Sequence, residues 1–209
     1  MPKAALDPAL LEQRIRSCRI CAENPLKTPL PHAPRPVAHL SATARLCIAG
    51  QAPGLRVHNS GLPFDDPSGQ RLRAWLAMDR ETFYDRRRLA IVPMGFCFPG
   101  YDKNKSDLPP RPECRAAWHD EVFAAMPQIE LVLAIGQYAQ AYHLGKLRHK
   151  SMTETARDWR AIYAAKAPRH VLAMPHPSWR NTAWLKRNPW FEAEVVPFLQ
   201  EEVRRLTAQ

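Results

Sequence analysis

Two short segments of this sequence combine residue types that could hold and act on an anionic ligand. Residues 50–64 read GQAPGLRVHNSGLPF, and Gly50 and Gly54 permit a close approach of main chain to a ligand. Residues 176–181 read HPSWRN and offer a positioned histidine, a hydroxyl for a phosphate, an indole for stacking and a cation. Taken singly, the first segment also fits an ordinary strand–helix connection, and the second fits a surface loop.

The cysteines form a second group with chemical potential. Cys18 and Cys21 make a Cys-x-x-Cys pair, and Cys97 and Cys114 flank a proline-rich stretch. Four thiolates can bind an iron–sulfur cluster or a zinc ion, and the spacing alone does not choose between them. Cys47 lies within an apolar run and is interpreted as a small core residue.

Both segments follow apolar runs that are typical of buried strands. Strands are predicted at residues 46–49, 89–92, 131–135 and 171–174. Helices are predicted at 8–18, 68–76, 114–125, 137–144 and 189–206, with Asp7 and Ser68 as the caps of the first two. This alternation predicts an α/β fold with a central, mainly parallel four-stranded sheet and helices on both faces. Ligands of such sheets bind beyond the carboxyl ends of the strands, so residues 50–69, 93–114 and 175–181 should border one cleft.

Composition narrows the class of protein. The 209 residues fit one compact domain, 1–209, and the formal charge of +10 favours an anionic partner such as nucleic acid. No apolar run reaches the length of a membrane span, and residues 1–16 lack a signal-peptide core, so a cytoplasmic protein without a membrane partner is expected. Structural disulfides are rare in that compartment, so the cysteines call for another explanation, either a metal site or unrelated buried thiols.

The two segments together resemble the uracil-DNA glycosylase superfamily, and most closely its iron–sulfur family four. The residues that fit that family's first motif are Gly50, Ala52, Pro53, Gly54, Gly61, Pro63, Phe64 and Gly69. The family's second motif is matched by His176-Pro177-Ser178, and Gly136 with residues 138–145 resembles its third strand–helix connection. The resemblance extends from about Cys18 to Trp190, most of the chain.

The resemblance implies a three-layer α/β/α fold and an enzymatic activity. The protein would hydrolyse the N-glycosidic bond of uracil, or of related deaminated bases, flipped out of DNA during base excision repair. It would act as a monomer and carry a 4Fe-4S cluster, rather than zinc, on Cys18, Cys21, Cys97 and Cys114, with an N-terminal arm, 1–40, contributing to the cluster.

The resemblance also assigns roles within the site. His176 would donate to a carbonyl oxygen of the departing base, Phe64 would stack on that base, and Gln51 would hold the attacking water where the closest family has Glu. Further contacts to base or DNA are expected from Gly50, Pro53, Gly54, Asp66, Met94, Gly95, Ser178, Trp179, Arg180 and Asn181. Among these, Ser178 would bind a flanking phosphate, and Trp179 or Arg180 would fill the gap left in the duplex.

Three departures from the family bear on chemistry and selectivity. Ala52 supplies no acid to activate water, and His58 replaces an acidic residue and is either functional or a plain loop residue. The pyrimidine-reading Asn aligns with Pro93, so the base would be read by backbone groups of residues 93–95 or by Asn59.

Other residues and other functions remain open on the sequence alone. Asp65 is interpreted as structural and Asp66 is left open, while Lys103, Lys105, Lys186 and Arg187 would flank a DNA groove. The competing function is a non-catalytic or abasic-site-trapping DNA-binding protein with the same fold. A zinc-ribbon module is disfavoured by the α/β pattern.

Overall fold

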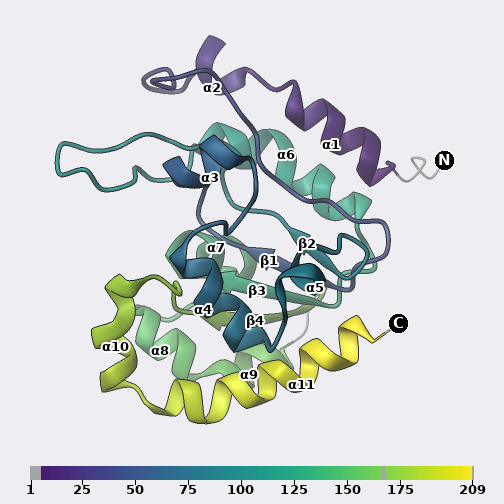
Figure 1. Ribbon diagram of the computed structural model, residues 1–209, viewed down its shortest axis with the longest axis vertical. Coiled ribbons are helices and arrows are strands. Elements are labelled where there is room, and N and C mark those ends of the chain that lie inside the picture. The colour runs from purple at the N-terminus through teal and green to yellow at the C-terminus, as the bar shows by residue number, and fades with distance from the viewer. Residues whose placement is uncertain (1–5, 166–167, 209) are drawn as a thin grey trace.

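The computed structural model describes residues 6–165 and 168–208 (Figure 1). The first five residues of the expected N-terminal arm lie outside that range. The strands are β1 (Leu46–Ala49), β2 (Leu89–Ile91), β3 (Leu131–Ile135) and β4 (His170–Met174). The α-helices are α1 (Pro8–Arg16), α2 (Ile20–Glu23), α3 (Leu55–Ser60), α4 (Pro67–Leu76), α5 (Arg80–Tyr84), α6 (Pro112–Ala125), α7 (Gly136–Leu144), α8 (Met152–Arg157), α9 (Trp159–Ala164), α10 (Thr182–Arg187) and α11 (Val196–Thr207). Short 3-10 turns span Gly145–Leu147 and Trp179–Asn181, and a π-helical turn spans Phe191–Val195.

The four strands form one parallel sheet in the order β2-β1-β3-β4. Leu46 of β1 is paired with Leu89 of β2 and Leu131 of β3, and Leu131 is paired with His170 of β4. The predicted strands and the predicted parallel α/β arrangement are confirmed. All carboxyl ends of the strands therefore reach the same edge of the sheet.

Helices cover both faces of the sheet, and the two faces differ in side-chain size. Alternate strand positions place the small side chains of Cys47, Ala49, Ala90, Ala134 and Ala173 against α1, α6 and α7. The large side chains of the intervening positions pack against α4, the π-helical turn and α11. The small residues let helices approach the sheet closely, and burial on both faces explains the continuous apolar runs of the sequence.

The helix boundaries correct two expectations. The cap of α4 is Asp66 rather than Ser68, because Pro67 occupies the first helical position and the Asp66 carboxylate accepts from the Gly69 N–H at 3.0 Å. The terminal helix is interrupted, since a π-helical turn at Phe191–Val195 precedes α11. Asp7 caps α1 as predicted.

The N-terminal arm is attached to the outer edge of β2. His39 and Ile91 exchange two backbone hydrogen bonds of 2.8 Å, and the Val37 N–H donates to the Phe96 carbonyl at 2.7 Å. Upstream, the buried Glu12 carboxylate on α1 accepts from Arg86 and from the Leu40 N–H. These contacts hold the segment that carries Cys18 and Cys21 against the segment that follows β2. No helix in the described part of the chain is long and apolar enough to cross a bilayer.

Candidate active site

A pocket lies at the carboxyl edge of the sheet and is called the sheet-edge pocket below. The loop after β1, the loop after β2 and the loop after β4 all contribute to it, as parallel strands require. Its lining residues are Val37, Gly50, Gln51, Ala52, Pro53, Gly54, Val57, Pro63, Phe64, Asp66, Ser68, Ile91, Pro93 and His176. The segments predicted from the sequence to border one cleft therefore meet.

The hydrogen bonds around His176 define which ring nitrogen can donate. The Ser178 N–H donates to His176 Nδ1 at 3.2 Å, so Nδ1 is unprotonated and the ring proton resides on Nε2. Burial lowers the pKa of His176, with a smaller opposing effect of Asp66, so the neutral ring is favoured. No group in the described residues pairs with Nε2, which leaves its N–H available to a ligand.

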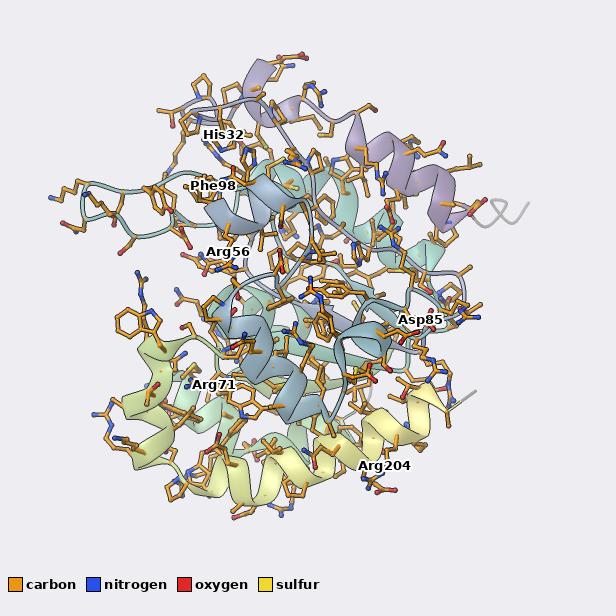
Figure 2. The ribbon with its side chains drawn as sticks, viewed as in Figure 1. His32, Arg56, Arg71, Asp85, Phe98 and Arg204 are labelled. Atoms are coloured by element: carbon orange, nitrogen blue, oxygen red, sulfur yellow. The ribbon has the colours of Figure 1, made fainter. Side chains whose placement is uncertain are left out.

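The loop that carries His176 is fastened from two sides. The Asn181 amide donates to the His176 carbonyl at 2.8 Å, inside the loop. Arg71 of α4 donates to the Ser178 carbonyl at 3.1 Å and to the Thr182 hydroxyl at 3.3 Å. Figure 2 shows Arg71 between α4 and the chain that leads into α10. The imidazole is therefore held in place before any ligand arrives.

Phe64 is held in the pocket by a strained backbone. Its φ is 55°, and its carbonyl oxygen would lie 1.9 Å from a β-carbon at Gly69, so only glycine fits at position 69. The Tyr84 hydroxyl donates to the preceding Pro63 carbonyl at 3.0 Å. The Phe64 ring reaches toward Gly50, whose missing side chain leaves room beside it. A planar ligand could stack in this place.

The donors expected from residues 93–95 are engaged elsewhere. The Met94 N–H donates to the Gly50 carbonyl and the Gly95 N–H donates to the Gln51 carbonyl, both at 2.9 Å. The Met94 side chain lines a separate cavity beside α7, and Gly95 lines a cavity formed by cysteines. These two residues therefore fix the loop after β1 and do not line the sheet-edge pocket.

His58 does not reach the sheet-edge pocket either. It lies on α3 rather than in a loop, and its ring packs 4.3 Å from His32 and 6.1 Å from Phe98. Figure 2 shows His32 and Phe98 close to one another, and their rings are stacked. Burial, followed by the charges of His32 and Arg35, lowers the pKa of His58. Asn59 is exposed, and its carbonyl accepts from Arg35 at 2.7 Å.

One side of the molecule carries exposed aromatic and basic residues. The Trp179 side chain is 75% exposed, and Arg180 beside it is also exposed. Lys186 and Arg187 lie on α10, while Lys103 and Lys105 lie on the loop that projects on the same side of the molecule (Figure 1). The sequence predicted these residues beside a groove, and the fold brings them to one side.

The nearby acids divide into engaged and free groups. Asp65 forms an ion pair with Arg80 at 3.3 Å, and Asp66 caps α4 while accepting from the Ser68 hydroxyl. Asp107, which belongs to neither motif, lies with Oδ2 3.7 Å from the position that a β-carbon would take at Gly54. No local sequence signal identifies it, because its proximity depends on the folding back of residues 101–107.

Four of the five cysteines line one cavity, called the cysteine cavity below. Its lining residues are Cys18, Ile20, Cys21, Leu30, Pro34, Pro36, Gly95, Phe96, Cys97, Arg111 and Cys114. The pKa of Cys21 is raised to about 11, chiefly by burial and then by Glu113 and Cys18. That of Cys97 is raised to about 12, chiefly by burial, with smaller contributions from Cys21 and Cys18. Cys47 is fully buried in the sheet, as predicted.

The cysteine cavity also contains donors to sulfur. The Phe96 N–H donates to Cys114 Sγ at 3.3 Å, and the Trp118 indole donates to Cys18 Sγ at 3.4 Å. Among the described residues, no group of three or more Cys, His, Asp or Glu side chains is arranged to hold a single metal ion. The cysteines surround a space instead of meeting at one point.

Comparison with known proteins identifies the family. One similar solved structure is the solution NMR structure of a proposed uracil DNA glycosylase from Methanosarcina acetivorans. The two sequences are 12% identical, and the alignment covers 78% of this chain and 94% of that one, with a TM-score of 0.46. The family description of the Uracil DNA glycosylase superfamily matches residues 37–200, a range that contains every residue found above to line the sheet-edge pocket. By this match over most of its length, the chain belongs to the uracil DNA glycosylase superfamily.

Proposed function

We propose that this protein is a DNA glycosylase that hydrolyses the bond between uracil and deoxyribose in DNA. The observation that carries the proposal is His176, a neutral imidazole held in the sheet-edge pocket with Nε2–H unpaired. A donor of this kind can meet an oxygen that gains negative charge as the base departs. The hydrogen bonds from Asn181 and Arg71 hold the loop that carries His176, which lowers the entropic cost of placing the imidazole in the transition state.

The proposed reaction separates charge across one bond. The C1′–N1 bond breaks, its electron pair leaves with the base, and positive charge develops on the sugar. His176 donates to the base carbonyl oxygen while Phe64 stacks on the flipped base. Gln51 and Ala52 line the same pocket, and no hydrogen bond among the described residues engages their backbone N–H groups, which we propose as further donors. Water then adds to C1′ and loses a proton, the departed base anion takes up one, and the hydrolysis is complete.

The exposed aromatic and basic residues support binding of the extrahelical nucleotide in DNA. Trp179 is large, apolar and exposed, which suits insertion into the space that the flipped base vacates. Lys186 and Arg187 on α10 and Lys103 and Lys105 on the projecting loop, all exposed on the same side of the molecule, offer phosphate contacts.

Selectivity for uracil is the finer part of the proposal. Pro93 lines the pocket where the resemblance expects a side-chain amide, and a proline has no amide side chain to read a pyrimidine edge. With the Met94 and Gly95 N–H groups engaged, little remains to distinguish uracil from other deaminated bases. We therefore propose a broader or slower enzyme, to be tested with oligonucleotides carrying uracil, hypoxanthine, xanthine and 5-substituted uracils.

The function is tested by incubating the protein with uracil-containing oligonucleotides, single-stranded and duplex, and measuring free base. Release of uracil is the expected result. A stable shifted complex that survives denaturation would identify an abasic-site-trapping protein. Binding without release, or neither, would contradict the glycosylase proposal.

We propose further that the cysteine cavity holds a 4Fe-4S cluster on Cys18, Cys21, Cys97 and Cys114. The four cysteines line one cavity, and the family resemblance favours a cluster there over a zinc ion, which four thiolates could also bind. The sulfur-directed donors Phe96 N–H and Trp118 Nε1–H suit thiolate or sulfide acceptors. The cluster would join the N-terminal arm to α6. Iron and acid-labile sulfide in purified protein would support this, whereas stoichiometric zinc would reject it.

A further inference from the structure

The sheet-edge pocket lacks an acid at the positions where the superfamily resemblance expects one. Gln51 and Ala52 carry no carboxylate. The two acids that follow Phe64 are both engaged, Asp65 with Arg80 and Asp66 with the start of α4. Moving Asp66 to serve as a base would break the cap of a helix that packs on the sheet.

Asp107 is the nearby acid that remains free. It lies at the base of the projecting loop, where it forms a bridge with Tyr101 and where the Leu108 N–H donates to the Gly100 carbonyl at 2.9 Å. Its Oδ2 lies close to Gly54, a residue that lines the pocket. Within residues 6–165 and 168–208, no hydrogen bond or ion pair engages its carboxylate.

Gln51 connects this acid to the pocket. The Gln51 amide donates to the Leu108 carbonyl at 3.4 Å, next to Asp107 in the chain. This contact uses the Nε2 group and leaves Oε1 free to accept from water. Gln51 would thus position both the attacking water and the segment that carries Asp107.

The surroundings of Asp107 favour a role as a base. Partial burial raises its pKa, Arg180 opposes that effect, and Asp66 adds to it. A carboxylate with a raised pKa accepts a proton more readily than an ordinary aspartate. The Asp66 charge raises the pKa of both Asp107 and His176. This shared effect agrees with a position of Asp107 near the mouth of the pocket.

We propose that Asp107 is the base that accepts a proton from the attacking water. This inference rests on the proposed glycosylase function. The C1′–N1 bond breaks and the base leaves with the electron pair. The water oxygen forms the new C1′–O bond, and one water proton passes to Asp107. That proton then returns through solvent to the released base, so the products are neutral uracil and an abasic sugar.

The test is single-turnover release of uracil with enzyme in excess over the oligonucleotide. Asp107→Asn should slow release by about 10²-fold or more without weakening DNA binding, as expected for loss of a general base. Asp102→Asn is the matched control. It removes one charge from the same loop but keeps the Oδ1 acceptor for the Asn104 and Ser106 N–H groups.

Two further measurements separate a base from a structural residue. The wild-type rate should fall on the acid side as Asp107 becomes protonated, and Asp107→Asn should lose that dependence. Formate should restore part of the rate to Asp107→Ala, because a small carboxylate can enter the vacated space.

An Asp107→Asn rate within a few-fold of the wild type would overturn the inference while leaving the glycosylase function intact. An Asp107→Asn defect that disappears at saturating enzyme would also overturn the inference, since Asp107 would then act on DNA binding through Arg180. A wild-type protein that releases no base would overturn the proposed function and this inference with it.

Discussion

The sheet-edge pocket and the cysteine cavity are neighbours with different construction. The pocket collects the loops after three strands and contains unpaired donors, among them His176 Nε2–H. The cysteine cavity collects the N-terminal arm, the segment after β2 and α6, and is lined by thiols and apolar side chains. Residues 93–97 border both, since Pro93 lines the first and Gly95 and Cys97 line the second. We therefore propose that the sheet-edge pocket performs the chemistry and that the cysteine cavity holds the segments that support it.

The largest expected effect concerns the cysteine cavity. If the proposed cluster is bound, Cys18→Ser should remove most of the iron and sharply lower the yield of folded protein, because the arm would lose its link through the cluster to Cys97 and Cys114. Cys47→Ala is the control, since Cys47 is buried in the sheet apart from the cavity. Iron content, visible absorption and circular dichroism measure the outcome. Equal iron in both variants would remove Cys18 from the ligand set.

A smaller effect on stability is expected in the sheet-edge pocket. Gly69→Ala should destabilise the protein by about 1–3 kcal/mol, because the added carbon would meet the Phe64 carbonyl at 1.9 Å. Gly50→Ala is the matched control, since its added carbon would lie at an ordinary 3.5 Å from the Phe64 ring. Thermal unfolding measures both. Similar melting temperatures for the two variants would mean that the Phe64 backbone can shift to make room for a β-carbon at position 69.

Trp179 should affect duplex DNA more than single strands. Trp179→Ala is expected to slow release from duplex several-fold and to change release from single strands little, since only a duplex leaves a space to fill. Leu10→Ala, at an exposed apolar residue of α1, is the control. Equal defects on the two substrates would argue against insertion of the indole.

The smallest effect concerns the salt dependence of binding. Charge reversal at Lys186 and Arg187 should reduce the slope of log affinity against log salt by about one unit for each phosphate that is no longer neutralised. Arg204→Glu is the control, because Arg204 lies on α11, well away from α10 in Figure 2. An unchanged slope in the double variant would place the DNA path elsewhere.

Much of the fold was predictable because parallel strands buried on both faces leave apolar runs in the sequence. The short helices α2, α3, α5, α8, α9 and α10 were not predicted, since four to six residues are too few to show a helical period. The α4 cap was misassigned between two good capping residues, although Pro67 at the first helical position pointed to Asp66.

The site residues that belong to a continuous sequence motif were predictable. Those that reach the pocket only through the fold of a distant segment were not. His176, Phe64 and the residues 50–54 line the pocket together. His58 follows the same motif but lies on the side of α3 that meets His32. Asp107 has no motif around it and approaches Gly54 only through the fold of its loop.

The proposed role of His176 is tested by the rate of uracil release by His176→Ala under single-turnover conditions. The loss of one transition-state donor should slow release by about 10²–10³-fold, or ~3–4 kcal/mol, with DNA binding nearly intact. Gln51→Ala should be milder, and His149→Ala, at an exposed histidine paired with Asp158, should behave as the wild type. A His176→Ala protein that binds DNA poorly but releases uracil at the normal rate would contradict the account.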